Sequence, residues 1–307
     1  MNQYIDLDRL FQPAATNELN TVRQVWRDID LRSDSFRIVT EFRFAGGRDV
    51  QVIEQYKEGA KHYGAILSPV DYDAQKKYPL LVWANGLDQT NPSVNLYGGS
   101  VKKIMQELPD HFIVIPSYRG QALVLRQDRF CSDGFFGDAY DGAATDALRL
   151  LTLAKQEFSS IDHENISVFG LSRGGTVALL MAVRDSTLKN IVSAAGPTNF
   201  FLQEVYQRYG QQYKYQFLSK ETSLDKIREK MMACSPEFFI DDFPNAILLV
   251  HGRNDRVVPV SNATKVAALL EGRDNFEIII NDGGHSFHAW DQVLEWIAIQ
   301  LLNSEAE

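Results

Sequence analysis

The stretch of residues 166–184 constrains the fold of this chain more than any other part of the sequence. It begins with a short apolar run rich in β-branched and aromatic residues, which predicts a strand buried on both faces. Residues 176–184 are apolar almost all round, which predicts a helix deep in a domain. Between them lies Gly-x-Ser-x-Gly, with Gly170, Ser172 and Gly174. Because glycines carry no Cβ to crowd a tight turn, this pattern predicts a nucleophile elbow that exposes the serine hydroxyl.

The rest of the chain has the rhythm of an α/β protein. Residues 1–60 are expected to form an N-terminal extension and antiparallel edge strands. From residue 78 onwards, strand-like and helix-like patterns alternate, which predicts a mainly parallel central sheet with helices on both faces. Residues 197–243 interrupt this alternation after the sixth strand and are expected to form a helical, cap-like insertion. The sequence thus predicts a single domain over residues 1–307.

Composition excludes several classes of function. The 307 residues are 45% hydrophobic and 23% charged, as in a globular protein with a large core. A net charge of −9 leaves no basic excess to neutralise phosphates, so no nucleic-acid partner is expected. Without an apolar run of ~20 residues or a signal-like N-terminus, we expect a cytoplasmic protein with no membrane span. Cys131 and Cys234 are expected to be reduced thiols.

A serine hydroxyl is a poor nucleophile at neutral pH, so Ser172 requires a base, and the base requires an orienting acid. His285 lies in a glycine-containing loop after the last expected strand and is the preferred base, with His288 as the alternative. Asp255 is the single acid in the loop after the preceding strand, although a turn or helix-capping role is its alternative. The chain order of serine, aspartate and histidine is the order expected in a nucleophile-elbow fold.

The tetrahedral intermediate of acyl transfer needs two hydrogen-bond donors at its oxygen. The backbone N–H of Arg173, directly after the serine, is one expected donor. The second is expected from the loop after the strand at residues 80–83, either as the N–H of Leu87 or as the side chain of Asn85. This sequence leaves the choice between them open.

Two arginine side chains, those of Arg119 and Arg173, have two interpretations. They could bind a substrate carboxylate, and Arg119 is kept as a candidate for that role. Alternatively they brace loops through carboxylates such as Asp141 or Asp146, which is the commoner use of arginines beside an elbow.

We expect no metal and no other cofactor. His251, Asp255, Asp282 and His285 could cluster, but the sequence has neither a His-Glu-x-x-His motif nor a cysteine pair with metal-binding spacing. A hydrolytic serine site requires no such group.

Several motifs together resemble the catalytic domain of the prolyl oligopeptidase family, which has the α/β-hydrolase fold. The resemblance extends over about residues 60–302. Its motifs are Tyr-Arg-Gly at 118–120, Gly-Leu-Ser-Arg-Gly-Gly at 170–175, Ser-Pro at 235–236, His-Gly-Arg-Asn-Asp-Arg-Val-Val-Pro at 251–259, and Gly-His-Ser-Phe at 284–287. It implies the same roles for Ser172, Asp255 and His285 that the loop positions suggest.

Two departures from the family pattern favour a small, open esterase-like site. The peptidases of the family usually carry a large β-propeller that gates oligopeptides, and this chain has no room for one. The sequence Asn85-Gly86-Leu87 replaces the His-Gly-Gly that is often found in the oxyanion loop.

The aromatic residues of the insertion also have two interpretations. Phe200, Phe201 and Tyr206 could line an acyl or aryl pocket above Ser172. They could instead pack the insertion onto the core.

We therefore expect a serine hydrolase that cleaves a small-molecule ester through an acyl-enzyme, as a carboxylesterase does. A peptidase or aminopeptidase acting on short peptides is the first alternative. A non-catalytic scaffold of the same fold, binding a ligand or protein, is the second. The oligomeric state stays open, with a homo-oligomer as one outcome.

Overall fold

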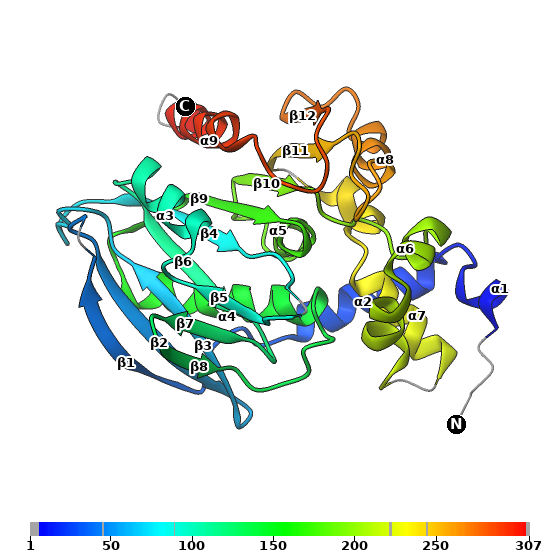
Figure 1. Ribbon diagram of the computed structural model, residues 1–307, viewed down its shortest axis with the longest axis horizontal. Coiled ribbons are helices and arrows are strands. Elements are labelled where there is room, and N and C mark those ends of the chain that lie inside the picture. Colours follow the sequence, from blue (N-terminus) through cyan, green and yellow to red (C-terminus); the bar gives the residue numbers. More distant parts are fainter. Residues whose placement is uncertain (1–5, 45, 89, 221–222, 244, 305–307) are drawn as a thin grey trace.

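The computed structural model describes residues 6–44, 46–88, 90–220, 223–243 and 245–304. These residues form a nine-stranded sheet and a small three-stranded sheet (Figure 1). The large sheet has the strand order β1-β2-β3-β6-β4-β9-β10-β11-β12. Its strands are β1 (Ser35–Arg43), β2 (Asp49–Lys57), β3 (Ala60–Leu67), β4 (Tyr78–Ala84), β6 (Phe112–Ser117), β9 (Ile161–Leu171), β10 (Asn190–Ala194), β11 (Ala246–Gly252) and β12 (Phe276–Asn281).

The large sheet is antiparallel at one edge and parallel elsewhere, which confirms the predicted architecture. Strands β1, β2 and β3 form an antiparallel ribbon, and β3 joins β6 in antiparallel register. All pairs from β6 through β4 and β9 to β12 are parallel. The small sheet consists of β5 (Ser93–Asn95), β7 (Ala122–Leu125) and β8 (Asp128–Cys131). Parallel neighbours require crossover connections, which place helices over the sheet.

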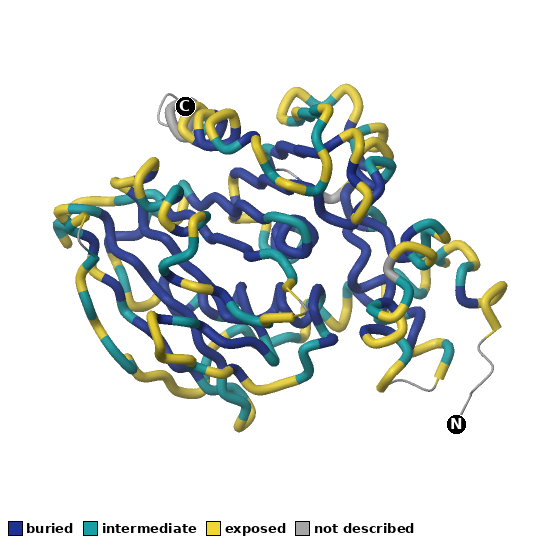
Figure 2. Tube along the Cα trace, in the orientation of Figure 1, coloured by how far each residue is buried: buried dark blue, intermediate teal, exposed yellow. Residues whose placement is uncertain are grey.

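Helices cover both faces of the large sheet (Figure 1). One face packs against α4 (Asp141–Glu157), α5 (Arg173–Arg184) and α8 (Ser261–Leu269), and the other against α3 (Gly99–Glu107) and α9 (Trp290–Ser304). The central strands and α5 are buried along most of their length (Figure 2). Within the described part of the chain, no helix is long and apolar enough to cross a bilayer.

Strand β4 shows why the parallel strands are apolar on both faces. Leu80 and Val82 belong to the core under α4 and α5, whereas Leu81 and Trp83 belong to the core under α3 and α9. Successive side chains of a strand point to opposite faces, so a strand between two helical layers needs a continuous apolar run.

A helical insertion lies between β10 and β11, as predicted. It contains α6 (Gln203–Tyr213), the π-helix η1 (Lys214–Leu218), α7 (Leu224–Ala233) and the 3₁₀-helix η2 (Pro236–Asp242). Strand β10 is the seventh strand of the large sheet in chain order when the outermost strand, β1, is counted.

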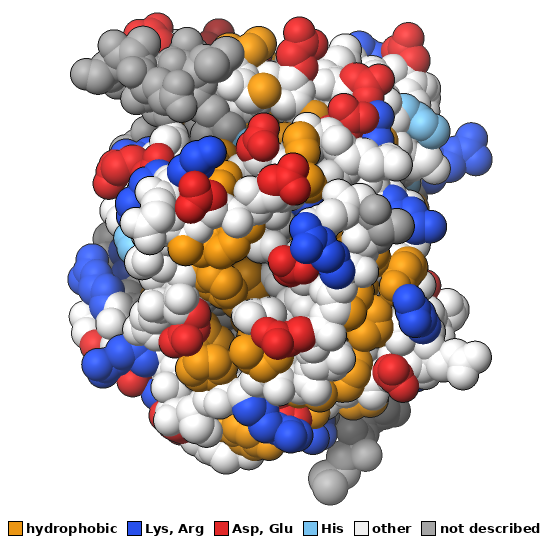
Figure 3. All heavy atoms as spheres, turned by 90° about the vertical axis from the view of Figure 1, so that its left-hand side faces the viewer, with side chains coloured by type: hydrophobic (Ala, Val, Ile, Leu, Met, Phe, Trp, Pro, Cys, Tyr) orange, Lys and Arg blue, Asp and Glu red, His pale blue; other side chains and the backbone are white. Residues whose placement is uncertain are grey.

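The sheet edge formed by β1 exposes apolar side chains, including Phe36 and Ile38. Figure 3 shows apolar side chains gathered among charged ones on the side of the molecule where β1 lies.

The N-terminal extension packs against this insertion rather than along the sheet. Helices α1 (Leu7–Leu10) and α2 (Thr16–Asp28) lie beside α7 (Figure 1). The buried Arg228 of α7 donates hydrogen bonds to the Glu18 carboxylate at 2.9 and 2.8 Å. Its guanidinium also donates to the backbone carbonyls of Arg9, Leu10, Gln12 and Pro13. One arginine thus satisfies the last carbonyls of α1 and those of the segment that follows it.

Replacing this arginine will loosen the N-terminal extension. Arg228→Met removes the partner of a half-buried carboxylate and of several carbonyls, which costs about 3 kcal/mol. For a chain of this size that loss lowers the Tm by roughly 5 °C, measurable by differential scanning calorimetry. Arg32→Met is the matched control, since Arg32 pairs with Asp30 on the surface with 74% of its side chain exposed. An equal Tm change in both variants would contradict this account.

Candidate active site

The predicted elbow is present at the junction of β9 and α5. Ser172 has φ 56° and ψ −121°, a left-handed conformation that non-glycine residues rarely adopt. The turn leaves no space for side chains beside it: a methyl group on Gly170 would collide with the carbonyl of Gly174, and one on Gly174 would collide with the carbonyl of Ala84. The N–H of Ser172 donates to Ala194 O at 2.7 Å. Neighbouring strand ends thus hold the serine in its exposed position.

The structure brings the three residues of the predicted triad together. His285 Nε2 lies 2.9 Å from Ser172 Oγ, and His285 Nδ1 lies 2.8 Å from Asp255 Oδ2. Hydrogen-bond contact on both sides of one imidazole is the arrangement that activates a serine nucleophile. His288, the alternative base, is exposed, and His285 is the histidine in contact with the serine.

Backbone contacts between two loops explain how Asp255 and His285 meet. The loops follow β11 and β12, which are parallel neighbours in the sheet. Arg253 N–H donates to Asn281 O at 2.7 Å, and Asn254 N–H donates to Gly283 O at 2.9 Å. The sheet register therefore continues into the loops and delivers both side chains to the same edge.

The carboxylate of Asp255 is buried and held in its ionised form. Burial opposes ionisation, but hydrogen bonds from His251, His285 and the Val258 backbone N–H outweigh it and hold the pKa of Asp255 well below its usual range. Asp255 Oδ1 accepts from the N–H groups of Val257 and Val258 at 2.8 and 2.9 Å. An ionised, immobile carboxylate fixes the tautomer of the histidine beside it.

His251 is a neighbour of this carboxylate that sequence reasoning considered only as a metal ligand. Its Nε2 lies 3.4 Å from Asp255 Oδ2 and 3.0 Å from Val258 O. Its position directly before the Asp255 loop was the available signal for a role beside the acid. Among the residues that the structure describes, no group of three or more His, Cys, Asp or Glu side chains is placed to hold a metal ion.

The loop after β4 lies against the elbow, but the side chain of Asn85 faces the interior. Its Nδ2 donates to Pro116 O at 3.1 Å, and its Oδ1 accepts from Arg173 Nη2 at 2.6 Å. This corrects the expectation that the Asn85 side chain could donate to the oxyanion, because it is committed to buried partners. A methyl group built on Gly86 would lie 3.7 Å from Ser172 Cβ, so the backbone that leads to Leu87 passes beside the serine.

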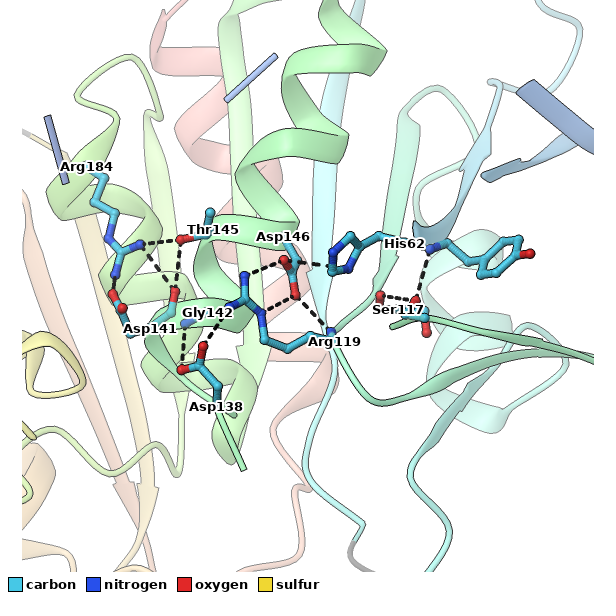
Figure 4. A network of polar contacts seen from close by, with 11 residues as sticks. His62, Ser117, Arg119, Asp138, Asp141, Gly142, Thr145, Asp146 and Arg184 are labelled. Atoms are coloured by element: carbon cyan, nitrogen blue, oxygen red, sulfur yellow. Dashed lines mark hydrogen bonds and ion pairs between the residues drawn. The ribbon is translucent and has the colours of Figure 1, made fainter. Parts of the chain in front are cut away.

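Arg119 points toward the carboxylates of Asp138 and Asp146 and braces the loop after β6 (Figure 4). Its Nε and Nη2 donate to the buried Asp146 of α4 at 3.0 and 2.8 Å, and its Nη1 donates to Asp138 at 2.6 Å. Burial raises the pKa of Asp146, but the Arg119 guanidinium outweighs it and keeps this pKa below its usual range. With its charge compensated by two carboxylates, Arg119 is corrected from a substrate ligand to a bracing residue.

The three aromatic candidates of the insertion are used in packing. Phe200 is fully buried, with ring centroids 4.6 Å from Tyr140 and 5.1 Å from Phe217. This corrects the expectation that Phe200 lines a pocket.

The other two aromatic candidates contact neighbouring segments. The ring centroid of Phe201 lies 5.4 Å from that of Phe238 and 5.2 Å from the guanidinium carbon of Arg228. Tyr206 packs edge-on against Phe11 of the N-terminal extension, 5.4 Å between centroids. The structure therefore favours the packing interpretation of the insertion aromatics.

Fold and elbow together define an α/β-hydrolase. Comparison of sequences adds the family: the model of the prolyl oligopeptidase family matches residues 98–301, and the chain belongs to that family. Two curated relatives are prolyl endopeptidase FAP of Mus musculus, 25% identical over 243 residues, and dipeptidyl-peptidase 5 of Porphyromonas endodontalis, 25% identical over 232 residues. The matches cover 73% and 74% of this chain but only 29% and 33% of those proteins, so it spans about a third of their length.

Solved structures with the same fold include both esterases and peptidases. Acetyl xylan esterase 1 from Thermoanaerobacterium sp. JW/SL YS485 superposes with a TM-score of 0.67 and 15% identity, covering 97% of this chain and 99% of that one. The acylaminoacyl peptidase of Pyrococcus horikoshii superposes with a TM-score of 0.60 and 16% identity, covering 90% of this chain and 43% of that one. The family and these folds support a hydrolase.

The contacts of Asp255 predict that replacing it by asparagine strongly lowers kcat. Asp255→Asn keeps the shape of the side chain but removes the charge that fixes His285 in its productive tautomer, so kcat is expected to fall roughly 10⁴-fold. Steady-state ester hydrolysis by the purified variant measures this.

The matched control for that variant lies on the neighbouring loop. Asp282 is 92% exposed and pairs with Arg253, so Asp282→Asn should keep the activity of the unchanged chain. Equal activities of the Asp255→Asn and Asp282→Asn variants would contradict the assigned role of Asp255.

Proposed function

We propose that this protein is a serine esterase that works through an acyl-enzyme. The observation that carries the proposal is the continuous chain of hydrogen-bond contacts from Ser172 through His285 to Asp255. A serine in a left-handed turn, with imidazole on one side, has the geometry of an activated nucleophile.

In the proposed mechanism, Ser172 Oγ attacks the ester carbonyl while His285 Nε2 accepts its proton. The backbone N–H groups of Arg173 and Leu87 stabilise the negative oxygen of the tetrahedral intermediate. His285 then returns the proton to the leaving alcohol, and the acyl group remains on the serine. Water, activated by the same imidazole, releases the acid, while Asp255 stabilises the imidazolium in both half-reactions. The proposal involves no cofactor.

Two observations favour an ester over a peptide as the substrate. This chain and an acetyl xylan esterase superpose over nearly the whole length of both. In addition, the Arg119 guanidinium is already paired with the carboxylates of Asp138 and Asp146, so it is not free to anchor the C-terminal carboxylate of a peptide. A neutral small-molecule ester needs no such anchor.

A second candidate is a peptidase or aminopeptidase acting on short peptides. The family and the curated relatives favour it, because both relatives are peptidases by name. Hydrolysis of p-nitrophenyl acetate is expected to be faster, in kcat/KM, than hydrolysis of alanyl or glycyl-prolyl p-nitroanilide. The opposite order would establish the peptidase instead.

The nucleophile itself is tested by labelling. Ser172→Ala should abolish both ester turnover and labelling by a fluorophosphonate probe, because the probe reacts only with an activated serine. Ser186→Ala is the control, since Ser186 is an exposed turn residue after α5. Unchanged turnover in Ser172→Ala would contradict the proposal. A complete lack of turnover and labelling in the unchanged chain would favour the non-catalytic scaffold.

A further inference from the structure

The side chain of Arg173 fills the space between the elbow and the loop after β4. The residue is 2% exposed, although its side chain carries a positive charge. Its Nη2 lies 2.7 Å from Gly86 O and 2.6 Å from Asn85 Oδ1, with Asn85 O at 3.4 Å. The same nitrogen is 3.1 Å from Gln121 Oε1. The residue after the nucleophile thus reaches back to the loop that supplies the second candidate donor.

The contact with Gly86 O fixes the direction of a neighbouring donor. The Gly86–Leu87 peptide is planar and trans, so its C=O and N–H point in opposite directions. Because the C=O of Gly86 faces the Arg173 guanidinium, the N–H of Leu87 faces away from it. Rotation of this peptide would break the hydrogen bond to Arg173.

The positive charge of Arg173 lies against an aromatic ring and not beside a carboxylate of the described residues. Among the described residues, no Asp or Glu oxygen forms an ion pair with it, and its guanidinium lies 4.6 Å from the centroid of the Tyr118 ring. Burial lowers the pKa of Arg173 to about 10, which leaves it protonated at neutral pH. A cation that bonds to a peptide carbonyl polarises the peptide and strengthens the N–H at its other end as a donor.

We propose that the Arg173 side chain is a positioning residue that orients and polarises the Gly86–Leu87 peptide, so that the Leu87 N–H serves as the second oxyanion donor. Arg173 thereby serves both donors of the oxyanion hole: its own backbone N–H is the first, and its guanidinium sets the direction of the second. This inference rests on the proposed function, because it assigns a part in the same acyl transfer.

The test compares Arg173→Met and Arg173→Lys with the unchanged chain on p-nitrophenyl acetate. The loss of one oxyanion donor lowers kcat about 10²–10³-fold, so Arg173→Met is expected to reduce kcat by roughly 10²-fold. KM should stay within about threefold, because the interaction develops in the transition state. The affinity for phenylboronic acid, which forms a tetrahedral adduct with the serine, should fall together with kcat. A role in stability alone would not move this affinity.

Controls separate positioning from folding. Arg184→Met removes another buried arginine of α5, one that pairs with Asp141, and should lower the Tm while leaving kcat within about threefold. Arg173→Lys keeps the charge and most of the packing, so it tests the inference even where the Met variant does not fold. Lysine lacks the planar fork, and its kcat should lie between that of Arg173→Met and that of the unchanged chain.

Two results would overturn the inference. One is an Arg173→Lys or a folded Arg173→Met variant whose kcat and phenylboronic acid affinity match those of the unchanged chain. The other is a loss expressed in KM alone. In either case, loss of turnover in the Ser172→Ala variant would still support the proposed function. Unchanged turnover in that variant would contradict the proposed function itself.

Discussion

The left-handed backbone of Ser172 is the constraint on which the rest of this structure depends. A non-glycine residue at φ 56° and ψ −121° costs about 1–3 kcal/mol, so its surroundings must hold it there. They do so through close backbone contacts: Gly170 lies against Gly174, Gly174 lies against Ala84, and the serine N–H donates to Ala194. The ends of β4, β9 and β10 therefore meet at one point, which the order of these strands in the sheet requires.

The same sheet edge positions the groups that surround the serine. Asp255 and His285 follow adjacent parallel strands, whose hydrogen-bond register continues into their loops. Three arginines then hold segments that lie outside the sheet. Arg173 holds the loop after β4, Arg119 holds the loop after β6, and Arg228 holds the N-terminal extension. Each multidentate guanidinium satisfies several buried acceptors at once, which single hydroxyl or amide groups could not do.

Features with local sequence signals could be predicted from the chain alone. The alternation of strand and helix patterns predicted the fold. The glycines around Ser172 and the loop positions of Asp255 and His285 predicted the residues that the structure brings together. Long-range packing had no such signal. The fully buried position of Phe200 depends on contacts with Tyr140, directly before α4, and with Phe217 of η1.

The contacts of the arginine side chains could not be predicted from the sequence either. The pairing of Arg119 with Asp146 joins residues 27 positions apart, and the sequence offered this pairing only as one of two possible roles for Arg119.

The central claim is that Ser172 forms the covalent intermediate. Acid-quenched mass spectrometry, within the burst of p-nitrophenyl acetate hydrolysis, tests it most directly. The account predicts one acetyl group per chain, located on Ser172. Burst turnover without an adduct, or with the adduct on the exposed Cys131, would contradict it.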